Sequence, residues 1–149
     1  MSPVAPLSTE VATELMKAMT RLRARLRTES APSEMRWTWS QLMTLARIVK
    51  EGPTTTSALA QAEHMRRQSM AETVAALRAN GLVTSGPDPD DGRKTLISGT
   101  SEGVALSKNI SAAREAWLDE AIRARLDPAD QQTLLKAASI MNRIADSTV

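Results

Sequence analysis

The chain has 149 residues with 19 basic and 17 acidic side chains, is 42% apolar, and contains no Cys, Phe or Tyr. This size fits a single domain, the lack of Cys excludes disulfides and thiol catalysis, and the single His excludes a His-rich metal site within one chain. No apolar run approaches the roughly 18 residues of a membrane span and no signal-peptide core is found, so we expect a cytoplasmic protein without membrane contact.

Two helices are predicted in the first third of the chain. Ser8 can cap a first helix, in which apolar residues recur every three or four positions as far as the segment 29–32. Thr38 and Gln41 match the Ser/Thr-x-x-Glu/Gln capping box that begins a second helix, and Gly52-Pro53 ends it. A core built from Leu, Met, Ala and Ile favours helices over strands in general.

A short third helix and a longer fourth helix follow. Four hydroxyl residues at 54–57 crowd the start of the third helix. The fourth helix is predicted over 66–80, because Met70, Val74 and Leu77 recur on one of its faces. We expect these three side chains to be buried and the opposite face of the helix to be exposed.

A hairpin and two more helices complete the chain. Two short strands are predicted at 82–84 and 95–97, because the segment 86–92 between them is dense in Gly, Pro and Asp. Thr100 can cap a long fifth helix of about 25 residues, and Asp127, which Pro follows, can cap a sixth. The predicted fold is mostly α with a small β-hairpin wing.

Six short sequence motifs follow one another along most of the chain. They are Thr38-x-x-Gln41, Gly52-Pro53, Leu59-Ala60, Leu77-x-x-x-Gly81-Leu82-Val83, Asp88-Pro89-x-Asp91-Gly92-Arg93 and Thr100-x-x-Gly103. With these segments and a winged helix-turn-helix order of elements, the chain resembles the MarR family of bacterial regulators. The resemblance implies one domain, 1–149, with a winged helix-turn-helix DNA-binding part at 38–98 and a helical dimerisation part at 1–30 and 100–149.

Two positions depart from the pattern of that family. Ser85 follows Val83 and Thr84 where the family usually has an Arg that can pair with the wing Asp, and Gly99 stands where a Leu usually precedes the fifth helix. Both changes predict a looser base of the wing.

The resemblance implies that the fourth helix enters the major groove of DNA and the hairpin tip enters the adjacent minor groove. The predicted DNA contacts are Arg66, Arg67, Gln68, Ser69 and Glu72 on the helix and Arg93 and Lys94 on the wing. Gln can bond adenine, and Glu can accept from cytosine. Two local alternatives stay open: Ser69-x-x-Glu72 as a capping box without a DNA role, and Arg93 as an exposed turn residue paired with Asp91.

The first, fifth and sixth helices carry more apolar surface than one small lobe can cover, and in the family they pack against a second chain. The predicted dimer contacts are Val11, Leu15, Leu118, Ile122, Leu134, Met141 and Ile144. Packing within the chain is the alternative. Family members often bind phenolic or aromatic carboxylate ligands between the two parts. The candidates here are Met16, Met19, Arg23, Trp39, Met43 and Trp117, which can equally be plain core.

Chemistry argues against an enzyme, because there is no Cys nucleophile, no Gly-rich phosphate loop and no suitable carboxylate pair. We therefore expect no metal and no cofactor. Residues 1–94 carry 13 basic and 10 acidic side chains, although ordinary solvated helix faces give the same balance.

The predicted function is a homodimeric, sequence-specific regulator that binds a palindromic operator in double-stranded DNA, a repressor relieved by a small aromatic or phenolic ligand. A helical dimer that acts as a protein-interaction module and has lost DNA binding is the alternative. A ligand-independent regulator is a third hypothesis.

Overall fold

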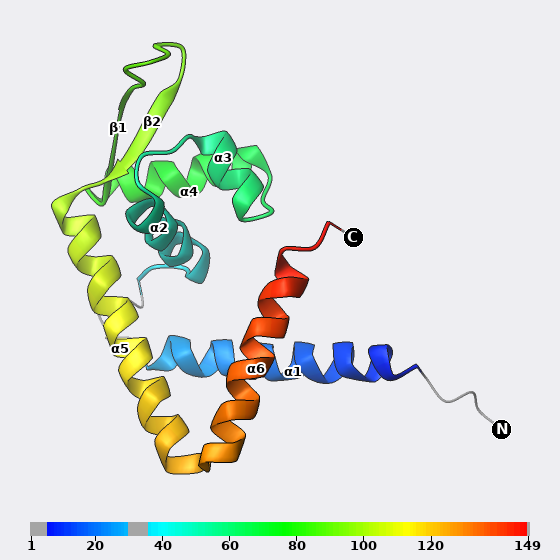
Figure 1. Ribbon diagram of the computed structural model, residues 1–149. Helices are drawn as coiled ribbons and strands as arrows, with labels where there is room; N and C mark the ends of the chain where they lie inside the picture. Colours follow the sequence, from blue (N-terminus) through cyan, green and yellow to red (C-terminus); the bar gives the residue numbers. More distant parts are fainter. Residues whose placement is uncertain (1–5, 30–35, 149) are drawn as a thin grey trace.

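The computed structural model describes residues 6–29 and 36–148, which form six helices and one two-stranded antiparallel sheet (Figure 1). The elements in chain order are α1 (Leu7–Thr28), α2 (Trp39–Glu51), α3 (Thr56–Ala62), α4 (Arg67–Ala79), β1 (Val83–Pro87), β2 (Thr95–Gly99), α5 (Ser101–Arg125) and α6 (Pro128–Ala145). This order and the fold class confirm the prediction.

Three of the predicted helix caps are present. The Thr38 hydroxyl accepts from the Gln41 backbone N–H at 3.1 Å, and the Gln41 side chain accepts from the Thr38 N–H at 2.9 Å, so the capping box of α2 is complete. Thr100 accepts from the Gly103 N–H at 3.1 Å at the start of α5. Asp127 caps α6 in the same way. Each cap satisfies a backbone donor that the first helical turn leaves without a partner.

The start of α1 and the extents of both strands differ from the prediction. Helix α1 begins at Leu7 after Pro6, which makes no side-chain cap, so Ser8 lies inside the helix. Both strands are also longer than predicted: β1 continues to Pro87, which pairs in register with Thr95, and β2 continues to Gly99, which pairs with Val83. A two-stranded sheet leaves each strand a free edge, and at an edge the missing N–H of a proline breaks no ladder bond.

The name winged lobe is used here for α2, α3, α4 and the hairpin, which share one core. Leu45, Met70 and Leu77 are completely buried in it, and Val74 is almost so, as predicted for the inner face of α4. Its buried apolar residues are Trp37, Leu42, Leu45, Ile48, Leu59, Ala60, Met70, Val74, Leu77, Leu82, Val83 and Ile97, with Ile110 from α5.

The base of the hairpin is tied to the chain on both sides. Thr54 and Ile97 exchange backbone hydrogen bonds of 3.0 and 2.7 Å, which fix the segment before α3 against β2. On the other side, a Cβ added at Gly103 would lie 2.0 Å from the Leu82 carbonyl oxygen. Only glycine lets the start of α5 approach Leu82, the residue before β1, this closely, which explains the Gly of the Thr100-x-x-Gly103 motif.

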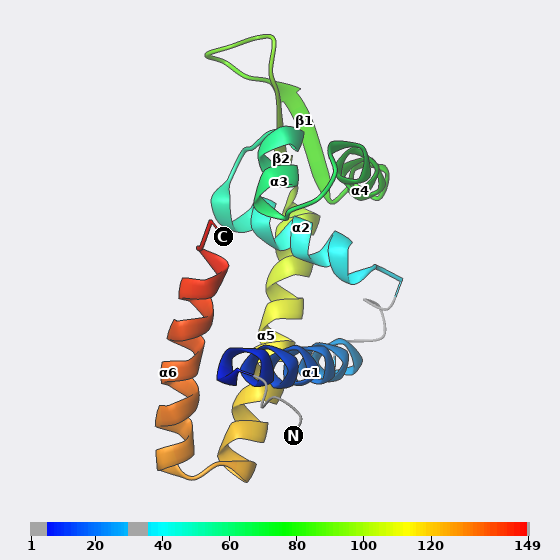
Figure 2. The same ribbon diagram turned by 90° about the vertical axis from the view of Figure 1, so that its right-hand side faces the viewer.

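The name helical lobe is used for α1, α5 and α6, where α5 and α6 diverge from their connecting turn and α1 crosses beside them (Figures 1 and 2). None of the described residues of α1 or α6 is buried. Every exposed large hydrophobic side chain in the described part of the chain lies on these two helices: Leu7, Val11, Met16, Met19, Leu22, Leu134, Leu135, Ile140 and Ile144. No described helix is long and apolar enough to cross a membrane.

Candidate nucleic-acid interface

The outer face of α4 presents polar side chains at its N-terminal end. Arg66 is the N-cap residue, α4 begins at Arg67, and Gln68, Ser69 and Glu72 are exposed. The alternative in which Ser69 begins a capping box is therefore wrong, because the helix starts two residues before it. The Gln68 amide instead donates to the Glu72 carboxylate at 3.4 Å, so the acid orients the amide one turn earlier.

At the hairpin tip, Arg93 is bound to Asp91. The Arg93 Nε and backbone N–H donate to one Asp91 oxygen at 3.1 and 3.2 Å, and Nη2 donates to the other at 3.4 Å. These bonds hold the pKa of Asp91 below its usual value, the side-chain bond contributing most. The Arg93 side chain nevertheless stays 91% exposed. The expected turn pairing is confirmed, and it leaves the guanidinium open to solvent.

The other two acids of the tip shape the turn. Asp88 accepts from the Asp90 N–H at 2.8 Å, and the Asp88 N–H donates to the Lys94 carbonyl at 3.0 Å. Ser85, where the family usually has an Arg, has a buried hydroxyl without a hydrogen-bond partner among the described residues. Asp91 thus takes its arginine from the tip itself.

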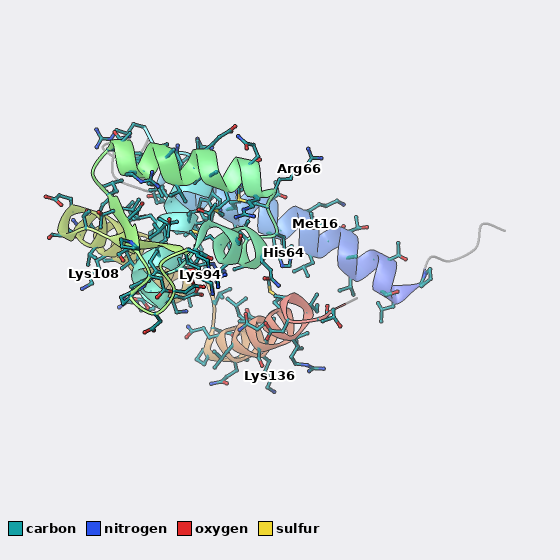
Figure 3. All side chains as sticks on the ribbon, turned by 90° about the horizontal axis from the view of Figure 1, so that it is seen from above. Met16, His64, Arg66, Lys94, Lys108 and Lys136 are labelled. Atoms are coloured by element: carbon teal, nitrogen blue, oxygen red, sulfur yellow. The ribbon has the colours of Figure 1, made fainter. Side chains whose placement is uncertain are left out.

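A hollow of about 540 Å³ joins the wing to the start of α4. It is lined by Thr55, Thr56, Ser57, Arg67, Arg93, Lys94 and Thr95, and we call it the phosphate cradle. Figure 3, a view from above, labels Lys94 on the hairpin and Arg66 where α4 begins. The lining offers three cations and four hydroxyls without a carboxylate, a donor set that suits phosphate oxygens.

The cradle joins residues that the sequence suggested separately. Arg67, Arg93 and Lys94 come together, whereas Gln68, Ser69 and Glu72 lie along the outer face of α4. The hydroxyls at 55–57 were not among the predicted contacts. Their signal was the dense hydroxyl run before α3, which sequence reasoning assigned only to starting a helix.

Several of the predicted ligand residues make separate contacts in the described part of the chain. At the junction of the lobes, the guanidinium groups of Arg23 and Arg114 lie 5.4 and 4.6 Å from the centre of the Trp39 ring. Trp117 instead lies under Arg25, at 5.4 Å. Met16 lines a separate hollow on α1 together with Glu14, Lys17, Ala18, Thr20 and Arg21.

The remaining candidates are divided by exposure. Met19 is 38% exposed and Met43 is half-buried. Of the predicted dimer contacts, Val11, Leu134 and Ile144 are exposed, and Leu15, Leu118, Ile122 and Met141 are half-buried. In the part of the chain that the structure describes, no group of three or more His, Asp or Glu side chains could hold a metal ion.

Comparison with known proteins identifies the family to which this chain belongs. Residues 37–95, which contain most of the winged lobe, match the MarR family. An HTH-type transcriptional regulator of Mycobacterium tuberculosis is 35% identical over 138 residues, which cover 93% of this chain and 94% of that protein. The chain belongs to the MarR family. It is accordingly a DNA-binding transcriptional regulator and not an enzyme, and the sequence-based assignment is confirmed.

Solved MarR-like structures confirm the fold of the described part of the chain. A transcriptional regulator from Pseudomonas aeruginosa has a TM-score of 0.76 and 32% identity, covering 97% of this chain and 99% of that one. Bordetella bronchiseptica BpsR, whose DNA binding is regulated by 6-hydroxynicotinic acid, has a TM-score of 0.74 at 21% identity, with coverage of 97% and 99%.

Proposed function

We propose that this MarR-family chain is a homodimeric repressor that reads a palindromic operator, with α4 in the major groove and Arg93 in the adjacent minor groove. The phosphate cradle is the observation that carries the proposal. An α-helix and a wing that enter neighbouring grooves must straddle a phosphate backbone, and Arg67, Arg93 and Lys94 line the hollow between these two elements. Hydroxyls at 55–57 add donors that fix the register without reading sequence.

Base recognition is assigned to the exposed residues of α4. Gln68 can bond adenine bidentately, and its contact with Glu72 holds the amide against the helix face. Glu72 and Ser69 lie farther along the same face, while Arg66 reaches backbone or guanine from the N-cap position. Arg93 suits a narrow minor groove, because such a groove concentrates negative potential.

Two-fold symmetry would come from the helical lobe. We assign residues 38–98 to DNA binding and residues 1–30 and 100–149 to dimerisation, where the apolar side chains of α1 and α6 would be covered by a second copy. The two copies of α4 would then read half-sites about 34–36 Å apart, one helical turn of DNA. Because an operator lies on chromosomal DNA, we expect the protein in the cytoplasm.

Fluorescence anisotropy with the DNA upstream of the protein's own gene tests this proposal. We expect binding at least about 1,000-fold tighter than to a scrambled duplex of equal length, with two chains per site by sedimentation. A dimer that binds both duplexes equally weakly would overturn DNA recognition and favour the protein-interaction module.

We further propose that a small hydroxylated aromatic acid releases the DNA. Arg23 and Trp39 at the lobe junction offer a guanidinium for a carboxylate and a ring for stacking, and the fold neighbour BpsR responds to an acid of this class. Hydroxybenzoates and 6-hydroxynicotinic acid would be titrated into the preformed complex while Trp fluorescence and DNA release are followed. If neither signal changes with any compound, a ligand-independent regulator is favoured.

A further inference from the structure

One face of α2 is bonded to the turn that leads into α4. Ser40, Thr44 and Arg47 are spaced four and three residues apart and therefore share a helix face. The Ser40 hydroxyl lies 3.6 Å from the Met65 sulfur, and the Thr44 hydroxyl lies 3.9 Å from the Met70 sulfur. Contacts to thioether sulfur are weak, so the contact of Ser40 with the turn and that of Thr44 with α4 hold these segments less firmly than a charged bond would.

Arg47 supplies the strong contact on this face. Its Nε donates to the Glu63 carboxylate, and its Nη1 donates to Glu51 of the same helix at 2.6 Å. The Arg47 and Glu63 side chains are only 32% and 22% exposed. The bond to Glu63 raises the pKa of Arg47 further above its usual value. Charge-assisted bonds of this kind are the strong and directional ones in proteins.

The turn held by this ion pair is short and conformationally unusual. Glu63 ends α3, and His64 follows with φ of +51°, a left-handed conformation that costs a non-glycine residue about 1–2 kcal/mol. The His64 and Met65 N–H groups donate back to Gln61 and Ala60 at 3.2 and 2.8 Å. Arg66 and α4 come next, and Figure 3 labels His64 and Arg66 at this end of α4. Any change in the turn therefore re-aims the N-terminal residues of α4.

We propose that Arg47, acting through Glu63, is a positioning residue that fixes the angle at which α4 meets DNA. This inference rests on the proposed reading of bases by α4. The core beneath the turn, which includes Leu45, Met70 and Val74, is closed without the ion pair. Loss of the pair leaves the winged lobe folded but lets α4 sample several approaches to the groove, and this lowers the preference for the correct site.

Two variants of opposite charge test the role. Arg47→Gln removes a positive charge and Glu63→Gln removes a negative one, so a purely electrostatic effect on DNA affinity would have opposite signs. The affinity ratio is the affinity for a duplex selected by the parent protein divided by the affinity for a random duplex. If Arg47 and Glu63 position α4, both variants change this ratio in the same direction, and each lowers it. We expect a loss of about fivefold in each, and no further loss in the double variant, because the two groups act as one pair.

Arg123→Gln is the matched control, because it breaks the exposed ion pair with Asp119 on α5, far from the turn. It should leave the affinity ratio unchanged. The charges of the pair can also be exchanged by combining Arg47→Glu with Glu63→Arg. This exchange is made in a Glu51→Gln background, because Glu51 would otherwise repel the new carboxylate at position 47. It should restore most of the lost affinity ratio. A ratio equal to that of the parent in both single variants, or opposite shifts in affinity with a constant ratio, would overturn the inference.

Amide hydrogen exchange without DNA is an independent measurement of how firmly the turn is held. Arg47→Gln and Glu63→Gln should speed exchange at His64 and Met65 by about fivefold while the thermal midpoint moves by only a few degrees, and Arg123→Gln should do neither. Unchanged exchange at these amides would also overturn the inference. A parent protein that prefers no DNA sequence would instead contradict the proposed function, so the two failures are distinguishable.

Discussion

The two lobes differ in how far each completes its own core. In the winged lobe, Leu45, Met70 and Leu77 have no exposed surface. In the helical lobe, none of the described residues of α1 or α6 is buried, and these helices carry every exposed large hydrophobic side chain of the described chain. The winged lobe is thus closed within one chain, whereas in the proposed dimer the arrangement of α1 and α6 would depend on a second copy. Half-site spacing would then be a property of that dimer.

Breaking the helical lobe should have the largest effect. Leu134→Asp combined with Ile144→Asp places two charges on the apolar face of α6, each replacing a side chain whose burial contributes about 1.5–3 kcal/mol. We expect the dimer dissociation constant to rise more than about 100-fold by sedimentation, while the circular dichroism of a folded winged lobe persists. Palindromic DNA should bind as weakly as one half-site.

Ser139→Asp is the control for this double variant, because Ser139 is exposed on the opposite side of α6 from Ile144. It should keep the parental mass. If the double variant stays dimeric, the apolar face of α6 is not the interface, and the comparison between the lobes fails.

Gly103→Ala should damage the winged lobe where α5 joins it. Helix propensity alone would make this change stabilising by about 1 kcal/mol, but the new Cβ would meet the Leu82 carbonyl oxygen at 2.0 Å and Leu82 is part of the core. We expect a net destabilisation of about 1–3 kcal/mol in chemical unfolding.

Gly99→Ala is the comparison for that change, because its Cβ would contact only side-chain methyl groups of Val49 and Val104, at 3.3 and 3.5 Å. It should cost clearly less than Gly103→Ala. Equal costs would mean that the start of α5 can move away from the hairpin, and the junction would then not be rigid.

Sequence reasoning succeeded where the physical cause is local. The caps at Thr38, Thr100 and Asp127 and the inner face of α4 follow from residues within one or two turns of each other. It failed at Ser8, because Pro6 had already begun the helix. The Arg47–Glu63 pair and the contact between Arg114 and Trp39 join residues 16 and 75 positions apart, and no periodic pattern announces such contacts.

Gln68→Ala tests base reading by the lobe that folds within one chain. It should cost about 1–3 kcal/mol on the cognate duplex and relax the preference at one position in each half-site. Anisotropy with a set of single-base variants measures this directly, and the dimer should be unaffected. An equal loss on random DNA would show that Gln68 does not read a base.

Arg93→Ala tests the wing. It should weaken specific binding by about 1 kcal/mol and reduce the slope of log affinity against log salt by about one phosphate equivalent per subunit. Arg93→Lys should recover only part of the loss, because an ammonium keeps the positive charge but sheds water less readily than a guanidinium. Parental binding by Arg93→Ala across a salt titration would make the hairpin a structural turn only.

The smallest expected effect is a change in the pKa of Asp91, which NMR of its carboxyl group measures. Because bonds from Arg93 lower the folded pKa of Asp91, the order that they give the tip is fully present above the ordinary Asp pKa of about 3.9 and is lost as the pH falls through the depressed value. Arg93→Ala should move the titration midpoint upward, since the side-chain bond is the largest cause. Lys94→Ala should not, because the Lys94 side chain makes no ion pair with Asp91 and its backbone bond to the Asp91 carbonyl survives.

Global stability should hardly change in this titration, since Arg93 is 91% exposed and solvent screens the pair. The wing would therefore lose its order in acid while the core of the winged lobe stays intact, which separates a locally stabilised tip from the buried part of the same lobe. An Asp91 that titrates at the ordinary value in the parent and the variant alike would mean that the two side chains do not hold each other in solution. Arg93 would then reach DNA from a tip that its own acid does not order, and the salt dependence of Arg93→Ala would be the remaining support for its role.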